Sequence, residues 1–372
     1  MRALSLYIHI PFCTRRCSYC SFFHVGRDPR REVDYVDALE SEIAATLGVL
    51  GDVRVGTVFV GGGTPSVLGF DHLARVFDAF APYVDARVTS EVTCEVNPED
   101  VTPDLLTFLE ERGVNRVSMG VQSMDAAAQR VLKRCSPQTN ARAIERVMAR
   151  FANVSFDVLL GVPGASTASV DVTLTALAAY HPAHFSVYCL EPGGDMEREV
   201  ESFFDGVDPD RSADEYLLVC DRLRERGYRH YEVSNFAQPG FESAHNRVYW
   251  EGREFLGVGP GAHSFLDGRR FSNAASLSDY LAHRGAARVP ARVGDTDDAD
   301  IGLERTMLAL RTAEGMPLSL ARGGLTAAEE LVREGLARIE GERLALTDRG
   351  FLLMNDIVLR VHGGSRRTER PC

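Results

Sequence analysis

The sequence has little of several features that would define other classes of protein. It has one tryptophan in 372 residues and neither internal repeats nor low-complexity stretches. A transmembrane helix needs a run of about 18 apolar residues, and none is present, so we expect a protein that is not integral to the membrane. The start, "MRALSLYIHIPFC", lacks the apolar core and cleavage site of a signal peptide and is typical of a strand. These absences predict a cytoplasmic protein.

Positive charge is also scarce. The chain carries 41 Lys and Arg against 53 Asp and Glu, a formal net charge of −12. A nucleic-acid backbone requires a basic face, so we expect no nucleic-acid partner. Only the tail over residues 363–372, "GGSRRTERPC", is locally basic, and we expect it to be disordered. In a reducing compartment, the eight cysteines are better interpreted as metal ligands and buried thiols than as disulfides.

The first half of the chain alternates short β-branched runs with longer helical patterns. Expected strands cover residues 4–10, 56–61, 87–96, 115–122, 154–161 and 184–190. Expected helices cover residues 36–50, 71–82, 103–112, 125–134, 137–151 and 166–180. Six βα units in series predict an α/β fold, a partial (β/α)6 barrel with a parallel sheet inside and helices outside. In such folds the chemistry lies at the C-terminal ends of the strands.

The regular alternation of strands and helices stops after residue 191, which predicts additional domains. We expect a core barrel over 1–191, a barrel extension over 192–297, a small domain over 298–362 and a tail over 363–372. The small domain has a helix, helix, hairpin, helix order typical of a winged-helix-like α+β fold, with Thr347 as N-cap of the last helix. Its helix "TAAEELVREGLARI" lacks a cationic stripe, so a lid or partner surface fits better than DNA binding.

Three cysteines lie close together in "HIPFCTRRCSYCSFF", residues 9–23, with C-x3-C-x2-C spacing: Cys13, Cys17 and Cys20. Thiolates favour zinc, Cu(I) or iron–sulfur clusters. A [4Fe–4S] cluster normally takes four cysteines, so three would leave one iron with an exchangeable position. Two alternatives stay open: zinc held with a distant fourth ligand, and three buried thiols without a metal. Four nearby aromatic residues would screen a cluster from water: Phe12, Tyr19, Phe22 and Phe23.

This motif, in a loop after a first barrel strand, resembles the radical S-adenosylmethionine (SAM) superfamily. Further segments match in order over about residues 4–361: "VFVGGGTPSVL", "TCEVNPED", "NRVSMGVQSMD", "SFDVLLGVPG", "HNRVYW", "GVGPGAHS" and "LTDRGFLLMNDIV". Together they are similar to the oxygen-independent coproporphyrinogen III oxidase (dehydrogenase) group and its relatives, the haem chaperones of HemW type. The resemblance implies a [4Fe–4S] cluster on the three cysteines, with SAM chelating the open iron through its amino and carboxylate groups.

The resemblance also implies a set of SAM-contacting residues. It comprises Tyr7, Gly62, Gly63, Thr64, Glu95, Gln122, Arg134 and Asp157, with backbone contacts to adenine at Leu190–Glu191 and Ala262–His263. Glycines allow close backbone approach, and an arginine can hold a carboxylate bidentately. Each of these residues could also have a purely structural role: the glycines could form a tight βα loop, Glu95 could be a solvated charge and Tyr7 could pack in the core.

Two departures separate this chain from the dehydrogenases that it resembles. Phe22 stands where they carry a fourth cysteine, and their longer segment before the first strand is missing, since Tyr7 is close to the N-terminus. Both favour the HemW type. Four residues of "HNRVYW" are candidates for haem contact: His245, Asn246, Tyr249 and Trp250. Imidazole and tyrosine can ligate haem iron, although a lone Trp beside a Tyr is also a common core anchor. His263 is a second candidate ligand, and His9 is expected to pack in its strand.

The sequence therefore predicts a haem chaperone that binds a [4Fe–4S] cluster, SAM and haem. It would deliver haem to an acceptor protein, such as a respiratory, membrane-associated haem protein. The alternative is a radical SAM enzyme, either the coproporphyrinogen III oxidase or another radical catalyst of the group. An electron donor such as flavodoxin would be needed if SAM is cleaved. A zinc-dependent scaffold is a third, weaker hypothesis.

Overall fold

The computed structural model describes residues 2–51, 53–190, 203–283, 288–289, 298–321 and 324–363. Three predictions lie outside this part of the chain: the SAM contact at Glu191, the boundary between residues 191 and 192, and the tail from residue 364 onward.

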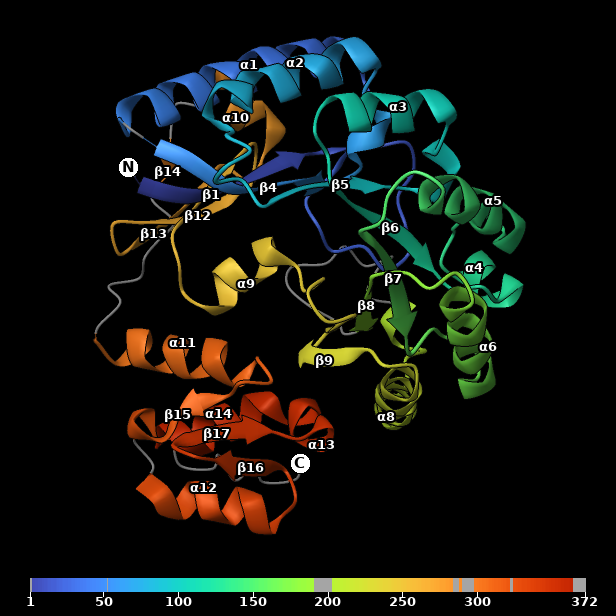
Figure 1. Cartoon of the computed structure of the whole chain (residues 1–372). Coiled ribbons are helices and arrows are strands. Elements are labelled where there is room, and N and C mark those ends of the chain that lie inside the picture. The colour runs from blue at the N-terminus through green and yellow to red at the C-terminus, as the bar shows by residue number, and fades with distance from the viewer. Residues whose placement is uncertain are drawn as a thin grey trace.

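One large sheet organises the described chain (Figure 1). Its parallel strands lie in the order β11 (Phe255–Val258), β1 (Arg2–Ile10), β4 (Val53–Gly62), β5 (Glu91–Val96), β6 (Arg116–Gln122), β7 (Val154–Leu160) and β8 (His184–Cys189). Antiparallel strands extend it at both ends: β12 (His263–Leu266), β13 (Arg269–Asn273) and β14 (Arg288–Val289) beyond β11, and β10 (Asn235–Ala237) and β9 (Arg229–Glu232) beyond β8. The predicted parallel α/β sheet is confirmed, and the segment after residue 203 continues it.

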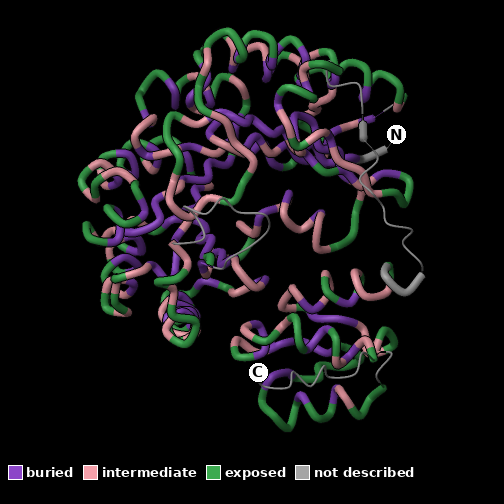
Figure 2. Tube along the Cα trace, turned by 180° about the vertical axis from the view of Figure 1, so that it is seen from behind, coloured by how far each residue is buried: buried purple, intermediate pink, exposed green. Residues whose placement is uncertain are grey.

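Helices cover the outer face of the parallel strands (Figure 1). They are α1 (Pro29–Val49), α2 (Phe70–Phe80), α3 (Pro103–Glu111), α4 (Ala126–Val131), α5 (Pro137–Met148) and α6 (Thr167–Ala178). Polar N-cap residues begin several of them: Thr102 accepts from Leu105 N at the start of α3, and Ser136 accepts from Thr139 N at the start of α5. The apolar stripe of α1 is fully buried at Leu39, Ile43 and Leu47. Figure 2 shows the result, a buried sheet inside exposed helix faces.

Several predicted boundaries were wrong, including the start of α1, which was expected at residue 36 and lies at Pro29. The strand expected over 87–96 begins at Glu91, because Val88 N and Thr89 N both bond to Asp85 O and form a turn there. The helix expected over 125–134 ends at Val131. Lys133 adopts a left-handed conformation with φ 54°, and this turn releases Arg134 from the helix.

The inner face of the parallel strands is polar. Thr57 of β4 donates to Ser5 of β1 at 2.8 Å, and Ser118 of β6 donates to Asp157 of β7 at 3.2 Å. Side chains alternate along a strand, so the opposite face is free to pack on the helices. The polar face therefore forms the lumen of an open barrel.

The last part of the chain is a small separate layer next to the barrel (Figure 1). It contains α11 (Asp298–Leu310), β15 (Met316–Pro317), α12 (Gly324–Arg333), β16 (Ala337–Glu340), β17 (Arg343–Leu346), α13 (Asp348–Leu352) and α14 (Met354–His362). This order of helices and hairpin agrees with the prediction. Thr347 caps α13 as predicted, since its hydroxyl accepts from Gly350 N at 3.1 Å. Two features were not predicted. β15 adds a third strand beside β17, and the final helix breaks at Leu353, which leaves helical geometry at φ −112° and ψ 20°.

This small domain docks on β9. Ala313 N donates to Tyr231 O at 3.0 Å, and Val233 N donates to Arg311 O at 3.0 Å. Arg311 also pairs with the buried carboxylate of Glu232 at 2.9 Å. Within the described residues, no helix combines the length and the apolar character that crossing a membrane requires.

Candidate functional site

The three cysteines of the motif lie in a loop at the C-terminal end of β1. Its ends are tied together by β2 (Phe12–Cys13) and β3 (Val25–Gly26), and Val25 N donates to Pro11 O at 2.7 Å. The Sγ atom of Cys13 lies 3.6 Å from Thr64 Oγ1. Cys20 N approaches Cys17 O at 3.4 Å, and all three thiols are half-buried. The loop therefore turns its thiols toward the edge of the sheet where chemistry was expected.

The electrostatics of this loop favour a bound cation. Burial raises the pKa of the Cys13 thiol, and burial raises that of Cys20 to about 11, with nearby Cys17 adding to both. Three thiolates without a cation would be costly here.

The aromatic screen is only partly as predicted. Phe12 is fully buried and packs against Tyr35, while Tyr19 and Phe23 are half-buried. Phe22 is 71% exposed, so the prediction that it screens the cluster was wrong. Among the described residues, little packs against this side chain.

The glycine turn after β4 supports the loop by close backbone contact. A Cβ at Gly63 would lie 2.7 Å from Phe12 O, and a Cβ at Gly62 would lie 2.7 Å from His9 Nδ1 at a φ of 113°. The amide N–H groups are already used: Gly62 donates to Glu95, Gly63 to Ile10 O and Thr64 to Phe12 O. A ligand ammonium would therefore meet carbonyl oxygens here rather than competing donors.

Arg134 connects the cysteine loop to the strand ends. Its Nη1 lies 3.6 Å from Cys17 Sγ, and its Nη2 donates to Asn97 Oδ1 at 2.8 Å and to Gly120 O at 2.5 Å. Asn97 in turn donates to Thr64 at 2.9 Å. The Nε of Arg134 is buried and has no partner among the described residues. An unsatisfied guanidinium nitrogen beside the loop is the kind of group that a ligand carboxylate would complete.

Gln122 ends β6 beside this arginine. It is 8% exposed and has a positive φ of 69°, which is rare for a residue other than glycine. A Cβ placed on Gly120 would lie 2.9 Å from its Nε2 and 3.0 Å from Arg134 Nη2. The structure therefore brings the predicted pair Gln122 and Arg134 together around Gly120.

Two acids face the lumen from neighbouring regions of the sheet. Burial and the charge of Asp157 raise the pKa of Glu95 to about 8, and burial raises that of Asp157 to about 6. Arg116, only 2% exposed, opposes both shifts. Sequence reasoning missed Arg116, although its place on the same face of β6 as Ser118 was a usable signal. Its Nε also has no partner within the described chain.

Tyr7 is oriented by His9, two positions further on the same face of β1. Tyr7 Oη lies 2.9 Å from His9 Nδ1, and His9 Nε2 lies 3.0 Å from Phe23 O. A carbonyl only accepts, so Nε2 carries the proton and the tyrosine donates to Nδ1. Burial lowers the pKa of His9 to about 4, which keeps the ring neutral. His9 therefore links Tyr7 to the cysteine loop.

The segment "HNRVYW" forms the short helix α9 (Ala244–Trp250), whose first N–H groups are capped by Glu91 of β5. His245 is 1% exposed and lies 2.8 Å from Thr57 Oγ1 through Nδ1 and 2.8 Å from Tyr249 Oη through Nε2. Both ring nitrogens are therefore engaged. Asn246 is half-buried beside them. His245 and Tyr249 face the lumen side of the helix, close enough that Glu95 raises the pKa of Tyr249, after burial.

Trp250 belongs to a different surface. It lines a cavity of about 820 Å³ between α9 and the C-terminal domain, together with Arg247, Arg305 and Arg343. Arg311 covers one face of its ring at 4.2 Å, and its Nε1 is buried without a partner among the described residues. The helix α9 lies between the barrel and the C-terminal domain (Figure 1), with Tyr249 near Glu95 and Trp250 on the cavity.

The remaining predicted residue, His263, begins β12 and its side chain is exposed. The preceding glycines pack under the cysteine loop. A Cβ at Gly259 would lie 2.4 Å from His9 O, and Gly261 approaches Phe23. This segment therefore reaches the site through its backbone.

Comparison with known proteins agrees with this geometry. A family model for the radical SAM superfamily matches residues 7–177. The curated haem chaperone HemW of Mycobacterium tuberculosis is 34% identical over 96% of this chain and 94% of its own length. HemW of Lactococcus lactis is 31% identical over 95% and 96%. The solved structure of coproporphyrinogen III oxidase (HemN) from Escherichia coli superposes with a TM-score of 0.82 at 22% identity, over 97% of this chain and 90% of that chain, which shows a shared fold.

Proposed function

Since this chain belongs to the HemW family of haem chaperones within the radical SAM superfamily, we propose that it binds haem and passes it to an acceptor protein. Membership in the superfamily implies a [4Fe–4S] cluster and SAM. The residues present fit both groups: three half-buried thiols share one loop, in which Cys13 contacts Thr64 and Cys17 contacts Arg134, whose Nε lacks a partner among the described residues. That arrangement supports the cluster and SAM, and the cavity beside Trp250 is the observation that carries the haem proposal.

Cys13, Cys17 and Cys20 would hold the cluster, which supplies an iron with a free coordination position when bound. Arg134 would receive the SAM carboxylate on its free Nε edge, and Gln122 would lie alongside. The carbonyl groups of Gly62 and Gly63 are suited to an ammonium, because their amides already donate elsewhere.

The two lumen acids and Tyr7 would contact the nucleoside part of SAM. Glu95 and Asp157 line the polar face that leads away from the cysteine loop, and each can accept from or share a proton with a ribose hydroxyl. Tyr7 donates to His9, so only its oxygen lone pairs stay available to a ligand. Adenine would meet the backbone near Leu190 and His263.

Haem would bind in the cavity beside Trp250. Its volume of about 820 Å³ lies within the range of ligand pockets, about 300–1,000 Å³. The indole offers a flat apolar face. Three arginines of the lining, Arg247, Arg305 and Arg343, could bind propionates, although three acids line the same cavity: Glu251, Glu314 and Glu340. His245 is committed to buried hydrogen bonds, so we assign it and Tyr249 to supporting α9. Trp250 lines the cavity and is kept as a haem contact, whereas Asn246 is not among the lining residues.

This arrangement gives α9 a role between the two sites. Tyr249 faces the SAM side and Trp250 faces the cavity, and they are consecutive on one short helix. SAM bound in the lumen would shift the position of α9 and thereby change the affinity for haem. The acceptor would be a haem protein, such as a respiratory one at the membrane. We place the chaperone in the cytoplasm, where its thiols stay reduced.

A radical enzyme of the same group is the second candidate, and the full set of SAM-facing residues favours it. Its substrate would enter the polar lumen, and an electron donor such as flavodoxin would be required. The absent fourth cysteine, with an exposed Phe22 in its place, makes the coproporphyrinogen III reaction the weaker version.

One experiment separates the two functions. The cluster is reconstituted without oxygen, haem is titrated by absorbance, and coproporphyrinogen III is offered with SAM and a reductant in parallel. The chaperone proposal expects one haem bound per chain and no decarboxylated product. Turnover to protoporphyrinogen would overturn it. A variant with all three loop cysteines changed to alanine should lose the cluster and still bind haem, because the cavity lies on the other side of α9.

A further inference from the structure

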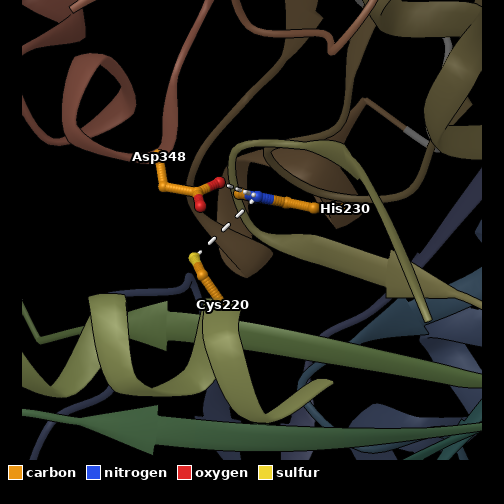
Figure 3. Close-up of side chains that lie close together, drawn as sticks. All are labelled: Cys220, His230 and Asp348. Carbon is orange, nitrogen blue, oxygen red and sulfur yellow. Dashed lines mark hydrogen bonds and ion pairs between the residues drawn. The ribbon is translucent and has the colours of Figure 1, made fainter. Parts of the chain in front are cut away.

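Three potential metal ligands meet where the C-terminal domain docks on the barrel. Cys220 comes from α8 (Pro209–Glu225), His230 from β9 and Asp348 from the first turn of α13 (Figure 3). Cys220 Sγ lies 3.9 Å from His230 Nδ1, and His230 Nδ1 lies 3.0 Å from Asp348 Oδ1. All three donor atoms lie within 4.8 Å of one another, which no other such group in the described chain achieves.

The geometry argues against a nucleophilic triad. In a triad the thiol and the carboxylate use opposite nitrogens of the imidazole, so that a proton can pass through the ring. Here the thiol and the carboxylate both face Nδ1. One N–H cannot serve both partners well, whereas one cation between the three atoms can.

The other ring nitrogen supports the same reading. Nε2 lies 3.3 Å from Tyr216 Oη and 3.4 Å from Val233 O, and Tyr216 donates its own proton to Val233 O at 2.7 Å. Both neighbours can therefore accept from Nε2–H. A metal-binding histidine typically donates its second N–H to such a partner, which turns the lone pair of the first toward the metal. With that tautomer, Nδ1 and the carboxylate oxygen present lone pairs to each other and need a positive centre between them.

The three groups are held in place by their surroundings. The His230 ring stacks on the ring of Phe236, with 4.1 Å between the ring centroids, and its centroid lies 5.0 Å from that of the Phe351 ring. Arg224 binds the second oxygen of Asp348, which leaves Oδ1 directed at the histidine. Cys220 is 1% exposed, whereas the Asp348 side chain is 24% exposed, so one side stays open to solvent.

We propose that Cys220, His230 and Asp348 bind a divalent transition metal ion, with zinc the best match, and that this ion fastens the C-terminal domain to the barrel. Mixed sulfur, nitrogen and oxygen donors suit zinc. Tetrahedral zinc would separate nitrogen from oxygen by about 3.3 Å and nitrogen from sulfur by about 3.6 Å, close to the observed 3.0 and 3.9 Å. Binding releases the thiol proton of Cys220, and water fills the fourth position.

The site goes beyond the haem proposal and is tested apart from it. The test protein is the full chain with Cys13, Cys17 and Cys20 changed to alanine, stripped of metal and titrated with Co²⁺ without oxygen. We expect one equivalent to give a thiolate-to-cobalt charge-transfer band and tetrahedral d–d bands that zinc abolishes. Cys220→Ser should remove the charge-transfer band, and Asp348→Asn should weaken binding at least about 10-fold. Cys135→Ser is the matched control, since it keeps the contact to Asn140 and should leave the band intact.

A second measurement covers the case in which the alanine variant does not fold. The unaltered protein, with its cluster reconstituted and zinc supplied, should contain one zinc per chain in addition to iron, and Cys220→Ser should lose the zinc and keep the iron. Zinc should also raise the unfolding temperature of the parent but not of Cys220→Ser. A band that survives Cys220→Ser, or a parent without stoichiometric metal, would mean that His230 and Asp348 form an ion pair only, and would overturn the proposal.

Discussion

The guanidinium of Arg134 lies 3.6 Å from the sulfur of Cys17, although 117 positions separate the two residues in the chain. The contact depends on the end of α4, where Lys133 N bonds to Arg130 O and Arg134 N bonds to Gln129 O. This left-handed helix ending turns Arg134 away from solvent and into the site. It places one strong anion-binding group directly beside the cysteine loop.

Replacing Arg134 should therefore weaken SAM binding without removing the cluster. Arg134→Lys keeps the charge but loses the planar fork, so we expect SAM affinity to fall about 10- to 100-fold, the value of one or two charged hydrogen bonds. Equilibrium dialysis without oxygen measures the change. Arg130→Ala, at an exposed position of the same helix, is the control and should bind SAM normally. Equal affinity in Arg134→Lys would contradict the assignment.

The glycine turn should matter for the cluster itself. Gly63→Ala would put a methyl group 2.7 Å from Phe12 O in the cysteine loop, and that backbone cannot easily yield. We expect the reconstituted variant to hold much less iron and sulfide per chain. Gly69→Ala has no heavy atom within 4 Å and an ordinary φ of −60°, so it should retain the full cluster. If both variants load equally, the turn does not support the loop.

Glu95 should make stability and SAM binding depend on pH. Its pKa is raised to about 8 from 4.5 by burial, so the folded chain binds more protons than the unfolded chain between these values. The free energy of unfolding should therefore fall as the pH rises through this window. SAM carries a net positive charge, so its affinity should instead rise with pH as Glu95 ionises. Glu95→Gln should flatten both profiles, as measured by chemical denaturation and by dialysis from pH 6 to pH 9. Profiles that keep their slope in this variant would assign the effect to another group.

Replacing His245 should lower stability and leave haem affinity nearly unchanged, whereas replacing Trp250 should lower haem affinity. His245→Gln removes buried hydrogen bonds to Thr57 and Tyr249, so we expect unfolding to need about 1–3 kcal/mol less free energy, with little change in haem affinity. Trp250→Ala should lower haem affinity by about 10-fold, and Trp250→Phe should restore most of it. Absorbance titrations with haem, run beside urea unfolding, measure both. Haem binding lost in His245→Gln at unchanged stability would make the histidine a ligand.

The sequence predicted the barrel well because its signals are local. Alternating strands and 3.6-residue helical patterns are visible within one segment, and the spacing of Cys13, Cys17 and Cys20 lies within a single loop. β11 was missed, since it is short and glycine-rich and becomes a strand only by pairing with β1, about 250 residues earlier in the chain. The cluster of Cys220, His230 and Asp348 was missed because its residues lie far apart in the chain and meet only in the folded structure.

The most direct test of the account is electron paramagnetic resonance of the reduced protein, recorded with and without SAM. A cluster held by Cys13, Cys17 and Cys20 alone has one iron open to a ligand, so its signal should change when SAM is added and should be absent when the three cysteines are alanines. An iron–sulfur signal that SAM leaves unaltered, or a protein that takes up no iron at this loop, would contradict the account.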